Sequence, residues 1–354
     1  MKKKNYILIT GNEACGEGAV QAGCRFYAGY PITPQNELTA YMSKRMDEVK
    51  GIFIQAESEL AAINMVFGAS CAGQRAITTS SSPGISLKQE GISYLAGAEL
   101  PAVIVNIMRG GPGLGNIAPS QADYFQATKG GGHGDYRIIV LAPASCQEMF
   151  DFTREAFDLA DKYRTPVMIL GDGMLGQMME PVAIKQGRTA RGGGQKMKPW
   201  ALTGARGRKP NIVRSFFIGE GVLEEHNKKL QKKFNTIRKS ETRSENYKTK
   251  KADIIIVAYG SMARVAKSCV DRLKNKLNIG LIRPVTLWPF PYKAVKSLDT
   301  GKTRFLAVEM SAGQMVEDVR LAVGDDERVH FFGRTGGGIP EEEEIIAKVL
   351  GLKL

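Results

Sequence analysis

The feature that most constrains the fold is the regular alternation of short apolar runs with longer stretches of helical pattern. Strands are expected at Tyr6–Ile9, Arg25–Ala28, Gly51–Gln55, Ala76–Thr79, Ala102–Ile107, Arg137–Leu141 and Val167–Leu170. Helices are expected at Pro34–Met46, Ser58–Cys71, Ser86–Ala96 and Ser145–Lys162. Such alternation is typical of a parallel sheet covered by helices, and uniformly apolar strands are typical of sheets buried on both faces. The sequence therefore predicts an α/β fold.

The pattern breaks once, and a second α/β unit follows. A chain of 354 residues exceeds what one hydrophobic core usually holds. A Gly-, Arg- and Lys-rich stretch, 187–210, precedes an amphipathic helix whose apolar positions are Leu223, Leu230, Phe234 and Ile237. Beyond it, strands are expected at Asp253–Ala258, Leu277–Leu281 and Arg304–Glu309, and helices at Ser261–Lys274 and Gln314–Ala322. We therefore predict a domain at 1–186, a basic linker with a helix at 187–250, and a domain at 251–354.

The positive charge is concentrated in one segment. The net charge is +13, but residues 184–251 alone hold 19 Lys and Arg against 5 Glu, so the rest of the chain is close to neutral. The segment has few aromatic residues on which bases could stack and no recognisable nucleic-acid motif. A solvated linker and helix, or a docking surface for an acidic partner or anionic substrate, explains the charge better. A nucleic-acid-binding protein is kept as a remote alternative.

Cysteine and histidine spacing argues against a metal centre held wholly by this chain. The five cysteines form no CxxC pair, and the three histidines lie far apart. This arrangement excludes zinc ribbons, a disulfide framework and a set of ligands for an iron–sulfur cluster. Redox chemistry would therefore need electron carriers in other chains.

The N-terminus does not predict export or a membrane anchor. A basic start is followed by an apolar run that ends at Gly11, which is too short for a signal peptide. No apolar run approaches the roughly 20 residues that span a bilayer. We therefore predict a cytoplasmic protein without membrane contact.

A stiff loop follows the second expected strand. Tyr30-Pro31-Ile32-Thr33-Pro34 contains two prolines, which fix their own φ and favour extended geometry in the residues before them. The loop would hold the Thr33 hydroxyl in one place. Thr33 could equally be a helix N-cap with Pro34 in the first turn, and the two roles are compatible.

Acidic residues stand where the third expected strand meets an Ala-rich helix. Glu57 and Glu59 lie in the sequence Gln55-Ala56-Glu57-Ser58-Glu59. They could be partners of the helix dipole. A carboxylate at the edge of an apolar helix can also be tuned for acid–base work. The motif alone leaves both readings open.

A glycine-rich loop follows the strand Ala102–Ile107. Gly111, Gly113 and Gly115 do not have the GxGxxG spacing, which argues against a self-contained nicotinamide dehydrogenase. The loop carries one charge, Arg109, which could pair with a carboxylate.

A fragment of a diphosphate-binding motif is present without its second half. Gly171-Asp172-Gly173 matches the start of the GDG…N pattern that holds Mg²⁺ and diphosphate in thiamine enzymes. No asparagine stands roughly thirty residues downstream, because Asn211 is too far away and follows the linker. We therefore predict no diphosphate site here and no metal site in the chain.

Together these residues resemble the alpha subunit of 2-oxoacid:ferredoxin oxidoreductases. The matching pieces in the first unit are Tyr30–Pro34, Ala56–Glu59, Arg109 and Gly171–Gly173. Those in the second unit, which are similar to a transketolase C-terminal-like domain, are Leu281–Pro291, Val308–Met310 and Gly333–Pro340. The resemblance covers nearly the whole chain and is weakest across the basic segment. It implies a parallel-sheet pyrimidine-binding domain of thiamine enzymes followed by a transketolase C-terminal-like α/β domain.

The resemblance also implies roles for the motifs. Glu59 would hydrogen-bond the pyrimidine of thiamine diphosphate and promote loss of the thiazolium proton. Pro31 and Ile32 would line the cofactor, and Thr33, Arg109 and Tyr30 would contact the 2-oxoacid. A role of His133 in the substrate pocket is less favoured, and Glu309 and Arg334 are expected to be structural.

The implied reaction needs partner chains. A beta subunit would hold Mg²⁺ and the diphosphate, an iron–sulfur subunit and ferredoxin would take electrons, and coenzyme A would take the acyl group. Ser120–Asp123 and Gly130–Asp135 look most like the branched-chain type. The substrate would then be 3-methyl-2-oxobutanoate, with 2-oxoglutarate or pyruvate as the alternative.

Overall fold

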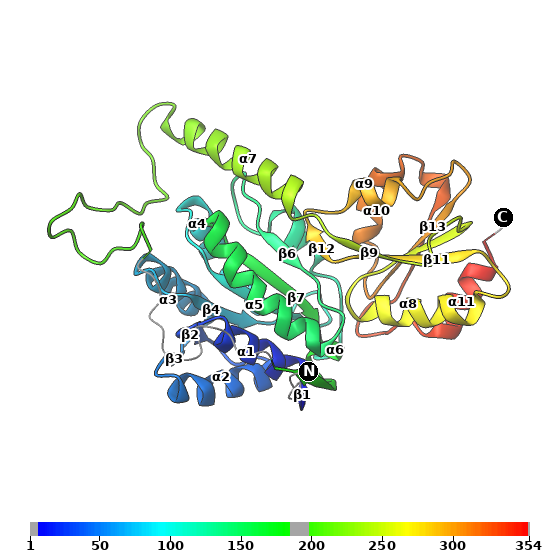
Figure 1. Cartoon of the computed structure of the whole chain (residues 1–354), viewed down its shortest axis with the longest axis horizontal. Coiled ribbons are helices and arrows are strands. Elements are labelled where there is room, and N and C mark those ends of the chain that lie inside the picture. Colours follow the sequence, from blue (N-terminus) through cyan, green and yellow to red (C-terminus); the bar gives the residue numbers. More distant parts are fainter. Residues whose placement is uncertain (1–5, 185–197, 353–354) are drawn as a thin grey trace, which may run out of the picture.

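Two helix-covered sheets follow one another along the chain in this computed structural model, which describes residues 6–184 and 198–352 (Figure 1). The first sheet has seven strands, in the order β12 (Thr286–Trp288), β6 (Ile139–Leu141), β7 (Val167–Asp172), β5 (Val103–Met108), β4 (Ala76–Ser80), β2 (Phe26–Gly29) and β3 (Ile52–Gln55). All neighbours are parallel except β12 and β6. The predicted α/β class with a parallel sheet is confirmed.

The helices of the first unit form two groups. One group packs α1 (Gly11–Gln21) against α2 (Asn36–Glu48) and α5 (Cys146–Tyr163), and the other packs α3 (Glu59–Cys71) against α4 (Ser82–Gly97). Short helical turns lie at Gln126–Gly130 (a π-helix) and at α6 (Gly173–Gln177). The strands of this sheet supply the core because β4, β5, β6 and β7 are buried along their whole length.

The first expected strand is a strand but not part of the parallel sheet. β1 (Tyr6–Thr10) pairs antiparallel with β8 (Met179–Ala183) in a separate two-stranded sheet. Thr10 caps α1 by accepting a hydrogen bond from the Glu13 N–H, while the Glu13 carboxylate accepts one from the Thr10 N–H. The helix α1 therefore begins directly after β1, and β1 pairs with β8 instead of joining the seven-stranded sheet.

Helix α1 was not predicted, because its glycines weaken the helical pattern. Those glycines allow close packing instead. A Cβ at Gly16 would lie 2.8 Å from the Tyr41 ring, and one at Gly18 would lie 2.5 Å from the Phe150 carbonyl oxygen. Tertiary packing against α2 and α5 thus offsets the low intrinsic helix propensity of glycine.

The predicted amphipathic helix is confirmed as α7 (Val222–Ser240). Leu230, Phe234 and Ile237 are buried, but Leu223 is 47% exposed, so its expected place on the apolar face is wrong. Leu223 lies in the first turn, beyond the part of α7 that packs on the first unit. The predicted loop at 187–210 is described only from residue 198 onward, and its earlier part lies outside the described residues.

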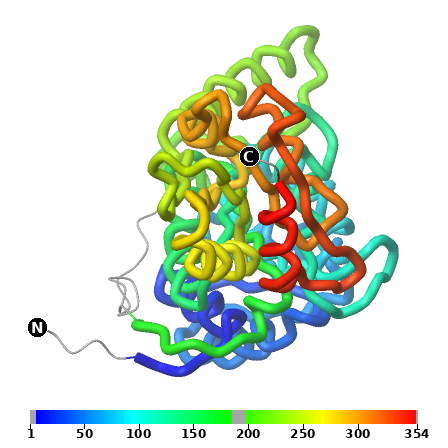
Figure 2. Tube along the Cα trace, turned by 90° about the vertical axis from the view of Figure 1, so that its right-hand side faces the viewer, coloured from blue at the N-terminus to red at the C-terminus, as the bar shows by residue number. Residues whose placement is uncertain are grey.

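The second sheet has five strands, in the order β14 (Val329–Gly333), β13 (Arg304–Glu309), β10 (Ile254–Val257), β11 (Ile279–Pro284) and β9 (Ser244–Tyr247). β9 runs antiparallel to β11, and the others are parallel. The helices of this unit are α8 (Gly260–Leu273), α9 (Tyr292–Lys296), α10 (Met315–Val323) and α11 (Glu342–Leu350), with a 3₁₀ turn at Asp326–Arg328. Figure 2 shows the C-terminal α11 (red) beside α8 (yellow).

The two units share structure instead of merely touching. β12 leaves the second unit and adds to the edge of the first sheet beside β6. The Arg283 guanidinium forms a two-pronged ion pair with Glu148 of α5, at 2.7 and 2.8 Å. Among residues 6–184 and 198–352, no helix is long and apolar enough to cross a membrane.

Candidate functional site

Glu59 is the first residue of α3, directly after the N-cap Ser58. The Ser58 hydroxyl accepts a hydrogen bond from the Ala61 N–H, which fixes the start of the helix. Glu59 is only 5% exposed, whereas Glu57 is exposed. In the described part of the chain, no hydrogen bond to the Glu59 carboxylate is found. A buried carboxylate without a donor is costly for the fold and is therefore available to a ligand.

A buried lysine that sequence reasoning missed lies beside Glu59. Lys88 of α4 is fully buried, and its Nζ lies 3.4 Å from the Glu59 carbonyl oxygen. Burial lowers the pKa of Lys88 to about 8, while the Glu59 carboxylate opposes that shift. The signal was present in the sequence: Lys88 shares the helical spacing of Ile85, Ile92 and Leu95, which all face the core.

The absence of a side chain at Gly84 makes room for the Glu59 carboxylate. A Cβ at Gly84 would lie 2.4 Å from Glu59 Oε1 and 2.1 Å from Ser80 Oγ. Within residues 6–184 and 198–352, the buried hydroxyls of Ser80, Ser81 and Thr78 have no hydrogen-bond partner. The Ser80 hydroxyl and the Glu59 carboxylate both approach this gap, which leaves one donor and one acceptor available to a ligand.

A buried polar network of hydrogen bonds, centred on Gln35, fixes the Tyr30–Pro34 loop. Gln35 Oε1 accepts from the Thr39 hydroxyl at 3.1 Å and from the Thr79 hydroxyl at 2.7 Å. The Tyr27 hydroxyl is hydrogen-bonded to both threonines. The Gln35 backbone N–H donates to the Ile32 carbonyl oxygen at 3.1 Å. The network thereby fixes the loop at the carboxyl end of β2.

Thr33 is not the N-cap of the following helix, so that alternative is wrong. α2 begins at Asn36, with Gln35 as its N-cap residue. The Thr33 hydroxyl accepts from the Asn36 side chain at 3.2 Å, and its carbonyl oxygen accepts from Arg109. The turn at Thr33 and Pro34 delays the helix by two residues relative to the prediction.

The Arg109 side chain is buried between two loops. Its Nη1 donates to the Thr33 carbonyl oxygen and its Nη2 to the Leu114 carbonyl oxygen, both at 3.0 Å. Its Nε is buried and has no hydrogen-bond partner among the residues that the structure describes. The structure therefore brings together Thr33 and Arg109, two residues that the sequence places 76 positions apart.

A second polar network supports Arg109 from α4. Ser82 Oγ accepts from the Arg109 N–H at 3.0 Å and donates to Asp123 Oδ2 at 2.6 Å. Asn106 also donates to Asp123, at 2.8 Å. Burial raises the pKa of Asp123, and the hydrogen bonds from Ser82 and Asn106 oppose the rise. Because Gly84 touches Glu59 and Ser82 holds Arg109, the first turn of α4 lies between these two groups.

The other predicted residues lie around this arrangement. Tyr30 and Pro31 are exposed and Ile32 is half-buried, and the backbone of Tyr30 and Ile32 is tied to Gln35. His133 is exposed and packs edge-on against Tyr94, about three turns along α4 from Ser82.

Residues of the second unit have structural roles. The buried Glu309 carboxylate accepts from the N–H groups of Gln314, Met315 and Val316 at the start of α10. Arg334 is exposed and forms a 3.4 Å ion pair with Glu344. Among the described residues, neither side chain is found in contact with Glu59.

The GDG fragment joins the two units. The Asp172 carboxylate accepts from the Ser261 hydroxyl at 2.5 and 2.6 Å and from the Leu175 N–H at 3.0 Å. Its oxygens are thus occupied at the start of α8. Among the described residues, no group of three or more His, Cys, Asp or Glu side chains could hold a metal ion.

Comparison with known proteins identifies the family. Residues 17–246 match the family model of the thiamine-diphosphate-binding domain of pyruvate flavodoxin/ferredoxin oxidoreductases. The chain belongs to this family. Residues 252–345 of this oxidoreductase-family chain match core domain II of pyruvate:ferredoxin oxidoreductase. The predicted family and class of enzyme are confirmed.

Curated relatives of the family align along almost the whole chain. The ketoisovalerate oxidoreductase subunit VorB of Methanothermobacter marburgensis is 51% identical over 343 residues, covering 97% of this chain and 96% of the relative. The 2-oxoglutarate synthase subunit KorA of Methanocaldococcus jannaschii is 37% identical over 365 residues, covering 97% and 99%.

Solved structures support the same fold. A 2-oxoglutarate:ferredoxin oxidoreductase from Magnetococcus marinus, with 2-oxoglutarate, coenzyme A and succinyl-CoA bound, matches with a TM-score of 0.86 at 27% identity. The match covers 99% of this chain and 66% of that one. An inactive split-gene transketolase matches with a TM-score of 0.59 at 14% identity, which shows the fold alone.

Proposed function

We propose that this chain is the pyrimidine-binding subunit of a 2-oxoacid:ferredoxin oxidoreductase that acts on 3-methyl-2-oxobutanoate. The observation that carries the proposal is the buried, unpaired carboxylate of Glu59 beside the glycine gap at Gly84. The 51% identity to a ketoisovalerate oxidoreductase subunit favours the branched-chain substrate. Two 2-oxoglutarate synthase subunits are 37% and 40% identical over 97% and 92% of the chain. They make 2-oxoglutarate the first alternative substrate, and pyruvate is the second.

The residues present fit one end of thiamine diphosphate. Glu59 would hold a proton at a pyrimidine ring nitrogen. The unpaired hydroxyls of Ser80 and Ser81 would form hydrogen bonds with the polar edge of the ring. Pro31 and Ile32, on the loop fixed by Gln35, would line the cofactor. When bound, thiamine diphosphate supplies a carbon nucleophile for the 2-oxo carbon and accepts the electron pair released as CO₂ leaves.

Other residues of the chain would orient the substrate. The guanidinium of Arg109 is fixed by two carbonyl oxygens and retains the unpaired Nε, so it would meet the carboxylate of the 2-oxoacid without reorganising. Thr33 and Tyr30 would contact the same substrate from the loop after β2. A fixed cation lowers the cost of binding because its side chain is already ordered.

The remaining parts of the reaction fall to partner chains. Asp172 is bonded to Ser261, so the GDG fragment would leave Mg²⁺ and the diphosphate to a beta subunit. An iron–sulfur subunit would pass electrons to ferredoxin, and coenzyme A would receive the acyl group. We propose that residues 1–186 bind the pyrimidine, that 187–250 form the basic linker and helix, that 251–354 form the transketolase C-terminal-like domain, and that the complex works in the cytoplasm.

The decisive experiment replaces Glu59 and compares it with a matched neighbour. In the assembled complex, Glu59→Gln is expected to lower the 2-oxoacid- and coenzyme-A-dependent reduction of a viologen dye by at least ~100-fold, the scale of a general acid–base group. Glu57→Gln removes the same charge from an exposed position and should retain wild-type turnover.

Two further readouts complete this experiment. Co-purification of the subunits and the unfolding midpoint of Glu59→Gln should match the wild type, so that lost turnover reflects chemistry. Wild-type turnover in Glu59→Gln would overturn the proposal. The ratio of kcat/KM for 3-methyl-2-oxobutanoate, 2-oxoglutarate and pyruvate then decides the substrate.

A further inference from the structure

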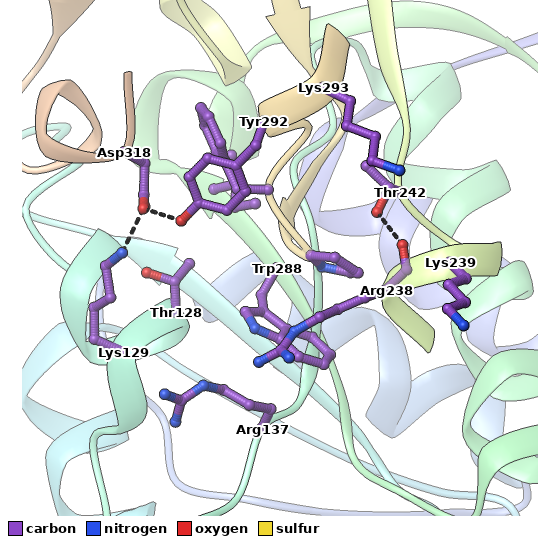
Figure 3. Close-up of a pocket in the computed structure, with 13 residues that line it drawn as sticks. Thr128, Lys129, Arg137, Arg238, Lys239, Thr242, Trp288, Tyr292, Lys293 and Asp318 are labelled. Carbon is purple, nitrogen blue, oxygen red and sulfur yellow. Dashed lines mark hydrogen bonds and ion pairs between the residues drawn. The ribbon is translucent and has the colours of Figure 1, made fainter. Parts of the chain in front are cut away.

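A pocket of about 570 Å³ lies at the edge of the first sheet that is opposite to β3 (Figure 3). Four separate parts of the chain form it: residues 128–137, residues 238–242 at the end of α7, residues 287–293 at the joint between the units, and Asp318 of α10. This volume lies within the range of small-molecule sites. The Glu59 carboxylate lies beside Ser80 of β4, and four strand spacings separate β4 from β12 at the pocket, or roughly 19 Å at ~4.8 Å each. The pocket is therefore distinct from the site around Glu59.

Four cations of the pocket have no carboxylate partner. Arg137, Arg238, Lys239 and Lys293 line the pocket, and in the described ranges none of them forms an ion pair. Arg137 donates to the Tyr136 carbonyl oxygen and Arg238 to the Asn235 side chain, both neutral acceptors. Four like charges around one cavity repel each other unless an anion enters.

Among the described residues that line the pocket, the one acidic side chain is Asp318, and its charge is already compensated. It accepts from Lys129 at 2.6 Å, from the Tyr124 hydroxyl at 2.5 Å and from the Tyr292 hydroxyl. Burial and Asp318 raise the pKa of Tyr292, whereas the positive charges of Arg238 and Arg137 act to lower it. Asp318 therefore leaves the four cations uncompensated.

One wall of the pocket is apolar and aromatic. Leu287, Trp288, Pro289 and Phe290 form this wall. The Arg238 guanidinium lies 5.8 Å from the centre of the Trp288 ring, and Phe234 meets that ring edge-on at 5.9 Å. Figure 3 shows both arginines beside Trp288, with Asp318, Lys129 and Tyr292 on the other side. A ligand for this pocket would combine a flat apolar part with two or more negative charges.

We propose that the pocket binds a phosphorylated nucleotide, with its phosphates on Arg137, Arg238, Lys239 and Lys293 and its base against the Trp288 wall. Guanidinium groups match the paired oxygens of phosphate, and aromatic walls accept a base by stacking. A free adenine nucleotide and the nucleotide end of coenzyme A share this chemistry. The proposal does not depend on the function proposed for Glu59.

The test is calorimetric titration of the full-length chain with inorganic pyrophosphate, ADP and coenzyme A at low ionic strength. ADP and coenzyme A are expected to bind at least tenfold more tightly than pyrophosphate, because they also use the apolar wall. Arg137→Gln and Arg238→Gln should each weaken nucleotide binding at least tenfold. Arg206→Gln, which removes an exposed arginine that does not line the pocket, should change nucleotide binding less than twofold.

The relative affinities distinguish the possible occupants of the pocket. Equal affinity for ADP and coenzyme A supports a free nucleotide as the ligand, and tighter coenzyme A binding supports the cofactor itself. Absence of binding to the wild type, or equal binding by both pocket variants and the control, overturns the proposal. Failure of the wild type to bind, together with loss of a co-purifying subunit in the arginine variants, would assign the surface to a protein partner instead.

Discussion

At the scale of single residues, burial gives chemical character to groups that look ordinary in the sequence. Lys88 is the clearest case, because it stands on the core-facing stripe of α4 and lies beside Glu59. Glu59 and Glu57 differ in the same way: the helix start is the same, but only Glu59 is buried. Although they are only two residues apart, the Glu57 side chain lies in solvent and the Glu59 side chain lies in the interior.

Lys88 predicts a specific dependence of stability on pH. Its pKa is 10.5 in the unfolded chain and about 8 in the folded one, so the unfolded state binds more protons between these values. The free energy of unfolding contributed by this group therefore rises with pH across the window, by on the order of 3 kcal/mol. Urea unfolding of the wild type and of Lys88→Met, from about pH 8 to about pH 10, should show a steeper rise for the wild type.

The comparison isolates one group, because other titrating residues are common to both proteins. Leu87→Met, which places methionine at an exposed position of the same helix, should keep the wild-type slope. Parallel pH profiles for wild type and Lys88→Met would show that the amine is not buried in the folded protein.

At the scale of elements, α4 organises the candidate site through its first turn. Ser82 holds the Arg109 backbone and the Asp123 carboxylate, and two residues later Gly84 leaves space for Glu59. The same helix carries Lys88 into the core. A glycine in a helix normally reduces stability, so its presence at Gly84 follows from the close approach of Glu59.

A side chain at Gly84 should therefore impair the reaction. In Gly84→Ala the new Cβ would lie 2.4 Å from Glu59 Oε1, so the carboxylate must move. We expect a loss of dye reduction of at least ~10-fold with little change in subunit assembly, since misplacement of a reacting group by about 1 Å can cost 10²-fold. The measurement is steady-state turnover beside an unfolding curve.

Gly68→Ala is the matched substitution in the neighbouring helix α3. Its Cβ would meet nothing within 4 Å, so it should leave turnover unchanged and stabilise the chain by about 0.5–1 kcal/mol. Equal turnover in the two alanine variants would show that Gly84 does not control the position of Glu59.

At the scale of the whole molecule, the two units are joined by exchanged structure and buried polar contacts. The second unit gives β12 to the first sheet, and Arg283 and Ser261 meet carboxylates of the first unit. Gln121 extends the joint, donating from its backbone N–H to the Met310 carbonyl oxygen at 2.8 Å and from its side chain to the Tyr259 carbonyl oxygen at 3.0 Å. Unfolding of one unit would break these contacts, which favours a single cooperative transition.

Removal of the Ser261 hydroxyl tests this joint. Ser261→Ala leaves the buried Asp172 carboxylate without its strongest donor, which should lower the free energy of unfolding by about 1–3 kcal/mol. Denaturant unfolding monitored by circular dichroism would measure this. Ser297→Ala removes an exposed hydroxyl directly after α9 and should change stability by less than about 0.5 kcal/mol. A similar small effect of Ser261→Ala would mean that the joint contributes little.

Sequence reasoning predicted most strands and helices but failed at particular places. It recovered the core strands β4 to β7 because uniformly apolar runs are distinctive. It missed α1, because glycines hide a packed helix, and it placed β1 in the wrong sheet, because periodicity does not identify the pairing partner. In the site it selected Glu59, Thr33 and Arg109 but not Lys88 or Asp123, whose surroundings come from α4.

The amino-acid sequence determined the alternating α/β architecture, the position of the acidic helix start and the lack of a metal-binding cysteine pattern, since these depend on local order along the chain. Tertiary structure alone decided which carboxylate is buried, which glycine makes room for it, and that Asp172 joins two units. Those properties depend on packing between residues far apart in the chain. The four pocket cations illustrate the same physical reason. The sequence gives their charge, but only the folded structure brings them to one cavity.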